Sequence, residues 1–233
     1  MRTKHVFFDL DRTLWDFEKN SESALQIIFD ELKLNDHLDS FESFHATYKQ
    51  VNSEWWNKYR YGKVSKDDLR VGRFTDALAR FDINSSEIAT QLSDRYVEVS
   101  PHQTILFPHT IETLKELKSN NHALHIITNG FKEVQFIKLR NSKLIEYFDD
   151  ILCSEEVGVN KPDPLVFQSA LQRTKAKSEE SMMIGDDFEA DILGAEKCGI
   201  RGVLFDPHDH FRENNAVHKI QTLKEVPSIV LGL

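Results

Sequence analysis

Short apolar runs that stop abruptly at polar residues recur along the chain. The first covers residues 5–8, and four more cover residues 124–127, 151–153, 182–184 and 202–205. Runs of this length and density are typical of buried parallel strands whose carboxyl ends open onto loops. Between the later runs, apolar residues recur at helical spacing, in segments at 134–144, 166–171 and 190–195. Strands that alternate with helices predict an α/β fold built on a doubly wound parallel sheet.

The runs are unevenly spaced, which indicates an insertion. More than a hundred residues separate Asp11 from the second run, and a helix at 108–119 accounts for only the end of that interval. Residues 16–100 are therefore predicted to be an inserted domain, within a core made of residues 1–15 and 101–233. Apolar spacing predicts only helices in the insertion, at 23–32, 41–56, 65–78 and 86–99, the third opened by a capping box at Ser65. A helical bundle at the carboxyl edge of the sheet would act as a cap, because α/β proteins bind ligands at that edge.

Composition narrows the classes of partner and compartment. With 29 basic and 38 acidic residues the formal net charge is −9, which argues against a nucleic-acid polymer as partner. Cys153 and Cys198 are too few for a disulfide scaffold and predict reduced thiols. The apolar run at the N-terminus stops at Asp9, too early for a signal peptide or a membrane helix. We therefore expect a cytoplasmic protein with no membrane partner, and the sequence does not predict its oligomeric state.

Polar residues with a shared chemistry follow the predicted strands. In a parallel sheet the carboxyl ends converge on one crevice. Clustered carboxylates repel one another unless a cation lies among them, and hard oxygen ligands select Mg²⁺. A Lys and a Thr nearby suit a dianionic phosphate, so the pattern indicates phosphoryl transfer. The residues at these ends are Asp9, Asp11, Thr128, Asn129, Asp186 and Asp187, with Lys161 in the loop between the third and fourth runs.

These residues resemble the four motifs of the haloacid dehalogenase-like hydrolases, in the same order and at the same strand ends. The resemblance covers nearly the whole chain and implies a Rossmann-like core with an inserted helical cap. The matching segments are Asp9-Leu10-Asp11-Arg12-Thr13 for motif one, Thr128-Asn129-Gly130 for motif two, Lys161-Pro162 for motif three, and Gly185-Asp186-Asp187 through Asp191 for motif four.

The resemblance assigns different roles to the two acids of motif one. Asp9 is expected to be the nucleophile that forms an aspartyl-phosphate, and also a metal ligand. Asp11 is expected to be the general acid that later activates water, with its backbone carbonyl on the metal. Dehalogenase members of the family lack this second acid, so Asp11 favours a phosphatase over carbon–halogen cleavage.

The same resemblance implies the remaining site residues. Thr128, Asn129 and Lys161 are expected to hold the phosphate of the substrate. Asp186 and Asp187 are expected to complete the shell of a Mg²⁺ cofactor. An alternative for Gly185-Asp186-Asp187 is a turn followed by a helix N-cap, and that role is compatible with metal binding.

Longer segments resemble the pyrimidine 5′-nucleotidase branch of this family. This implies a small phosphorylated metabolite as partner, a nucleoside monophosphate such as UMP, dUMP or dTMP. A broad sugar-phosphate or phosphoglycolate phosphatase is the alternative within enzymes, and a catalytically weak phosphate-binding regulator is the alternative outside them. The segments that carry the resemblance are 126–131, 154–164 and 191–195, with Trp55, Tyr59, Gly62, Arg73 and Phe74 in the insertion.

Other conspicuous residues have ordinary structural explanations. Trp55 and Trp56 lie at helical spacing, so we expect core packing, with at most one facing a substrate. The run from Asp206 to His210 is interpreted as a solvated loop rather than a second metal site. Asp16 marks the entry into the insertion, as a helix cap or a hinge contact.

Overall fold

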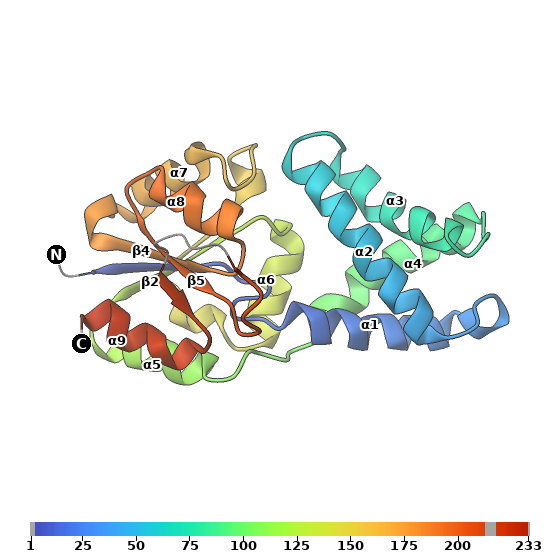
Figure 1. Cartoon of the computed structure of the whole chain (residues 1–233), viewed down its shortest axis with the longest axis horizontal. Coiled ribbons are helices and arrows are strands. Elements are labelled where there is room, and N and C mark those ends of the chain that lie inside the picture. Colours follow the sequence, from blue (N-terminus) through green and yellow to red (C-terminus); the bar gives the residue numbers. More distant parts are fainter. Residues whose placement is uncertain (1–2, 213–217, 233) are drawn as a thin grey trace. The chain divides into compact units, whose positions relative to one another are not determined.

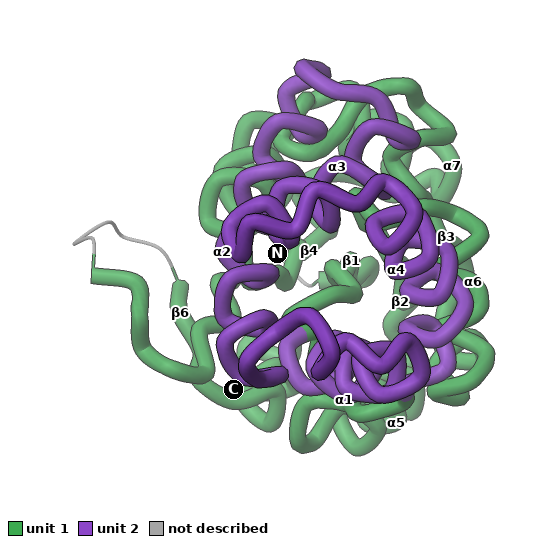
Figure 2. Tube along the Cα trace, turned by 90° about the vertical axis from the view of Figure 1, so that its right-hand side faces the viewer, with its two compact units in different colours: residues 1–17, 104–233 green, residues 18–103 purple. Residues whose placement is uncertain are grey.

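The computed structural model describes residues 3–212 and 218–232, and Figure 1 gives the order of its elements. The chain divides into two compact units, one of residues 1–17 and 104–233 and the other of residues 18–103 (Figure 2). The segments that leave and rejoin the first unit lie side by side. Trp15 pairs antiparallel with Leu106, and the N–H of buried Asp16 donates to Ile105 O at 3.0 Å. The second unit therefore begins directly after the loop that carries Asp9 and Asp11.

Six parallel strands form one sheet in the described residues, in the order β3-β2-β1-β4-β5-β6. This confirms the doubly wound α/β fold, and the five predicted strands are all present. The last strand was not predicted, because it has three residues and begins with an exposed His. The strands are β1 (His5–Phe8), β2 (Ala123–Thr128), β3 (Asp150–Cys153), β4 (Ser181–Gly185), β5 (Arg201–Phe205) and β6 (His218–Ile220).

Side chains of the central strands alternate between two apolar layers, because successive residues of a strand point to opposite faces. Val6 and Phe8 of β1 pack in the cluster that includes α5 (Thr110–Ser119) and α9 (Val226–Leu231). Phe7 packs in the opposite cluster, with α7 (Pro164–Thr174) and α8 (Gly194–Glu196). Figure 1 shows these two helix pairs on opposite sides of the sheet. Val6, Phe7 and Phe8 are fully buried, which fixes the position of Asp9 just beyond them.

Two helices of this unit differ from their predicted extent. The helix predicted at 134–144 is α6 (Lys132–Asn141), and Leu144 lies beyond its end although it is buried in the same cluster. The segment predicted as a helix at 190–195 begins as a π-helix, η6 (Phe188–Leu193), followed by the short α8. Single-turn 3₁₀ helices lie at Leu34–Asp36, Ser100–His102, Ile145–Tyr147, Ser154–Glu156, Ser178–Glu180 and Leu223–Glu225.

The unit of residues 18–103 contains helices around a separate apolar core. The predicted capping box is present: Ser65 Oγ accepts from Asp68 N at 3.1 Å, and Asp68 Oδ2 accepts from Ser65 N at 3.0 Å. Trp55 packs against this core, and its Nε1–H donates to Asp76 Oδ2 at 2.8 Å. The helices are α1 (Phe17–Glu31), α2 (Phe41–Arg60), α3 (Lys66–Ala79) and α4 (Ser86–Val99).

Cys153 is buried, Cys198 is partly buried, and both are free thiols. Nowhere in the described ranges does a helix have the length and apolar character needed to cross a membrane.

A buried histidine in β2 links the fold to pH. His125 stacks on His5, with His5 Nδ1 and His125 Nε2 3.1 Å apart. Burial, and then the neighbouring His5, lower the pKa of His125 to about 4. Protonation below the unfolded pKa of about 6.5 therefore favours the unfolded chain. The resulting loss of stability grows as pH falls from about 6.5 to 4 and is constant below that range.

We expect His125→Gln to flatten this dependence. Between pH 7.5 and 5.0 the variant should lose about 2 kcal/mol less unfolding free energy than the parent. Urea unfolding at the two pH values measures the difference, with the same exchange at exposed His102 as control. Equal losses in the parent and in His125→Gln would contradict the assignment.

Candidate active site

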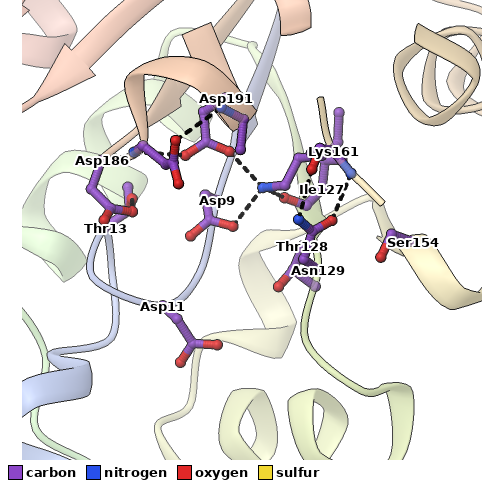
Figure 3. A network of polar contacts seen from close by, with 12 residues as sticks. Asp9, Asp11, Thr13, Ile127, Thr128, Asn129, Ser154, Lys161, Asp186 and Asp191 are labelled. Carbon is purple, nitrogen blue, oxygen red and sulfur yellow. Dashed lines mark hydrogen bonds and ion pairs between the residues drawn. The ribbon is translucent and has the colours of Figure 1, made fainter. Parts of the chain in front are cut away.

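The carboxyl ends of the central strands bring a buried lysine and two aspartates together (Figure 3). Lys161 Nζ lies 2.7 Å from Asp9 Oδ1, 2.6 Å from Asp191 Oδ1 and 2.7 Å from Ile127 O. An ammonium group has three N–H donors, so these acceptors use all of them. Lys161 therefore holds two carboxylates in place, and a contact with a phosphate would require one of these bonds to exchange.

Asp9, Asp186 and Asp191 form a group suited to a cation. Each offers a carboxylate oxygen, and these oxygens lie within 4.8 Å of one another. Burial raises the pKa of Asp9 to about 7 against the opposing charge of Lys161. Burial, followed by the charges of Asp9 and Asp191, raises the pKa of Asp186 well above its usual range. Neighbouring carboxylates repel one another when all are ionised, and a cation between them removes this repulsion. The oxygen donors therefore fit a hard divalent cation such as Mg²⁺.

The path of the chain after β4 decides which aspartate turns back toward the strand end. Asp187 Oδ1 accepts from Glu189 N and Ala190 N at 3.1 and 2.9 Å, so Asp187 caps η6. Asp191, four residues on, accepts from Asp187 N at 3.1 Å. A Cβ on Gly185 would lie 2.2 Å from Asp191 Oδ2, so the glycine leaves room for this carboxylate. Asp187 thus serves as the N-cap and stands outside the carboxylate group that includes Asp191.

Asp11 faces a different set of partners. Lys138 Nζ lies 2.6 Å from Asp11 Oδ1, and Gln135 Nε2 lies 2.8 Å from Asp11 Oδ2. Both partners belong to α6, three residues apart and hence on one face of the helix. Gln135 Nε2 also donates to Thr128 Oγ1 at 2.8 Å. The structure therefore ties Asp11 to the end of β2 rather than to Lys161.

Thr128 and Asn129 follow β2 but have different contacts. Thr128 Oγ1 accepts from Gln135 Nε2 and from Gly130 N at 2.8 and 3.1 Å. Within the described chain these are its hydrogen bonds, which leaves its own proton to be donated, as a phosphate oxygen requires. Asn129 instead bonds the backbone of Lys161, through Oδ1 to N at 2.8 Å and Nδ2 to O at 3.1 Å. Asn129 thus fixes the loop that presents Lys161.

A family comparison identifies the class of protein to which the chain belongs. The model of the haloacid dehalogenase-like hydrolases matches residues 3–199, which include every residue of the site. The chain is a haloacid dehalogenase-like hydrolase. The resemblance inferred from the four motifs is thereby confirmed, together with the hydrolase class.

Relatives of this hydrolase are named for more than one substrate. Pyrimidine 5′-nucleotidase YjjG of Escherichia coli (strain K12) is 29% identical over 89% of this chain and 88% of its own. Ribulose-1,5-bisphosphate 5-phosphatase of Halopiger xanaduensis is 32% identical over 97% of this chain and 98% of its own. The crystal structure of YfnB from Bacillus subtilis, bound to magnesium, matches with a TM-score of 0.89 at 25% identity, covering 100% of both chains.

Three residues of this hydrolase site were not singled out as functional by sequence reasoning. Asp191 lies in motif four, and its spacing from Gly185 was the available signal. Gln135 and Lys138 lie on α6 and are 0% and 5% exposed. A polar pair three residues apart, shortly after Thr128-Asn129-Gly130, was a signal that could have identified them.

The carboxylates in the run from Asp206 to His210 contact residues that follow them in the sequence. Asp206 accepts from His210 N and Phe211 N, both at 2.9 Å. Asp209 pairs with Arg212 and Lys219. Each of these carboxylates thus has hydrogen-bond or ion-pair partners of its own.

Proposed function

We propose that this chain is a Mg²⁺-dependent phosphomonoester hydrolase that forms an aspartyl-phosphate on Asp9, acting on a pyrimidine nucleoside 5′-monophosphate. One observation carries the proposal. Asp9 is buried, held by Lys161, and within cation-sharing distance of Asp186 and Asp191. A structural ion pair needs one acid for one lysine, whereas here three acids lie close together and only two of them, Asp9 and Asp191, pair with Lys161.

The chain's own residues supply the two chemical steps. Asp9 attacks phosphorus, and the bond from phosphorus to the ester oxygen breaks while Asp11 gives its proton to that oxygen. Water then attacks the phosphorus, Asp11 takes a proton from it, and the bond from phosphorus to Asp9 breaks. The products are the alcohol and inorganic phosphate. Thr128 donates a hydrogen bond from its hydroxyl group to a phosphate oxygen in both steps.

Asp9, Asp186 and Asp191 would hold the cation. A bound Mg²⁺ supplies positive charge that offsets the repulsion between the phosphate and the carboxylates. Support for this assignment comes from the raised pKa values of the three acids and from the magnesium-bound structure of YfnB. The protein's contribution is to keep Asp9 aimed and to exclude water from Lys161, which is 2% exposed.

Removing the metal should therefore stop turnover while the fold persists. In excess EDTA, phosphate release should fall to background, and added Mg²⁺ should restore it. At about 100 times its Kd, Mg²⁺ should raise the unfolding free energy by about 2.7 kcal/mol. The shift should vanish in Asp186→Asn, measured by thermal unfolding without substrate. Full activity in EDTA would contradict the metal assignment.

The substrate class rests on the pyrimidine nucleotidase among the relatives and on the matching segments of the sequence. The 32% identical ribulose-1,5-bisphosphate 5-phosphatase supports a sugar phosphate as the second candidate. A phosphate-release panel of UMP, dTMP, AMP, glucose 6-phosphate and ribulose 1,5-bisphosphate separates the two. A kcat/KM highest for UMP or dTMP supports the nucleotidase, and a maximum on a sugar phosphate supports the alternative. No turnover of any ester would favour a phosphate-binding regulator.

We also propose that the helical unit is the cap that selects substrates by size. Its insertion directly after the loop of Asp9 and Asp11 supports this role. A phosphopeptide added to the same panel tests it, since a cap should exclude the peptide. Turnover of the peptide at the rate of UMP would contradict a size-selecting cap.

A further inference from the structure

Lys138 and Gln135, both on α6, donate hydrogen bonds to the side chain of Asp11. Each oxygen of the Asp11 carboxylate receives one donor, Oδ1 from Lys138 Nζ at 2.6 Å and Oδ2 from Gln135 Nε2 at 2.8 Å. A protonated carboxyl group keeps acceptor capacity beside its O–H, so both contacts and the proton that Asp11 transfers can be accommodated on the two oxygens. The two contacts thus fix the position and plane of the carboxyl group and leave it free to carry and transfer a proton.

Lys138 is an unusual residue to find buried on a helix. It is 5% exposed, its ammonium lies 4.2 Å from the centre of the Trp15 ring, and Asp11 is its sole carboxylate partner in the described part of the chain. A buried ammonium is expensive to desolvate, and its ion pair with Asp11 offsets part of that cost. Trp15 closes the turn that begins at Asp11, since Arg12 N donates to Trp15 O at 2.9 Å. Lys138 therefore joins both ends of the loop that carries Asp11.

Gln135 links Asp11 to Thr128, the residue proposed to bind the phosphate. Its two amide hydrogens are divided between Asp11 Oδ2 and Thr128 Oγ1, both at 2.8 Å. Gly130 makes room for the amide, because a Cβ at that position would lie 2.2 Å from Gln135 Nε2. One side chain thereby sets the distance between Asp11 and the hydroxyl of Thr128.

We propose that Lys138 and Gln135 are positioning residues that aim the Asp11 carboxylate at the leaving oxygen of the substrate, in register with Thr128. This inference rests on the proposed function, in which Asp11 transfers the proton. Neither residue touches the reacting atoms. Misplacing a catalytic group by about 1 Å can slow a reaction by about 10²-fold, so the effect of losing either contact should be large.

The test exploits a leaving group that departs without a proton. Lys138→Met and Gln135→Met each remove the donors and keep an unbranched side chain. The first turnover of UMP, or of whichever panel ester the parent hydrolyses, is followed by quench-flow with enzyme in excess, and so is that of p-nitrophenyl phosphate. In both variants, alcohol release from the alkyl ester should slow by about 10- to 100-fold. Release of p-nitrophenol in the first turnover should stay within about threefold of the parent, because that step needs no acid.

A purely structural role would slow both esters equally, and that result would overturn the proposal. So would unchanged alkyl-ester kinetics in both variants. Lys132→Met, at an exposed lysine on the same helix, is the matched control. If Lys138→Met does not fold, the uncharged exchange at Gln135 still decides the question. An inactive parent would instead refute the proposed function, so the two failures are distinguishable.

Discussion

Asp9→Asn should abolish turnover of every ester, by at least about 10⁴-fold. The amide has nearly the same shape as the carboxylate but is a poor nucleophile, so no covalent intermediate can form. The fold should persist, because Lys161 keeps Asp191 and Ile127 O as acceptors and one of three repelling acids is removed.

Steady-state kinetics on UMP and p-nitrophenyl phosphate, with a thermal unfolding curve, check this expectation. Asp149→Asn is the control, because Asp149 lies just before β3 and pairs with Lys118 of α5. Residual activity above about a hundredth of the parent would exclude Asp9 as the nucleophile.

Lys161→Met should inactivate the enzyme and destabilise it by about 3–5 kcal/mol. Asp9 and Asp191 would then remain buried without their shared cation. Because the pKa values of both acids are already raised in the folded state, stability should be recovered as pH is lowered and the acids protonate. Urea unfolding between pH 8 and 5 measures this recovery.

Two comparisons make the test specific. Lys161→Met/Asp191→Asn removes one of the stranded acids and should regain part of the lost stability. Lys132→Met removes an exposed ion pair and should change the unfolding free energy by less than about 1 kcal/mol. A loss below about 1 kcal/mol in Lys161→Met itself would show that the buried cation is dispensable.

The elements that the sequence predicted correctly are those marked by a pattern within a few consecutive residues. The strands β1 to β5 are dense apolar runs, and the capping box at Ser65 is a four-residue signal. The strand β6 escaped because three residues with an exposed His at one end carry no clear pattern. The extent of α6 was overestimated because Leu144 is buried by packing after the helix has ended.

For the site, the sequence predicted which residues lie at the strand ends but not which residues they contact. Gly185, Asp187 and Asp191 are a motif in the sequence. Which acid caps η6 and which one meets Lys161 depends on the π-helical path between them. Gln135 and Lys138 resemble surface residues of an amphipathic helix. Their burial against Asp11 follows from packing between α6 and the loop after β1, and the one local signal was their spacing shortly after Thr128-Asn129-Gly130.

A phosphate bound covalently to Asp9 distinguishes this mechanism from direct attack by water, and rapid-quench labelling detects it. The enzyme is mixed with ³²P-labelled p-nitrophenyl phosphate, whose leaving group departs without a proton, quenched in acid within the first turnover, and digested for peptide mapping. We expect acid-stable, hydroxylamine-labile label on the peptide that contains Asp9. The label should accumulate further in Asp11→Asn, where water is no longer activated. Absence of covalent label in parent and variant, or label on another residue, would contradict this mechanism and favour direct attack by water.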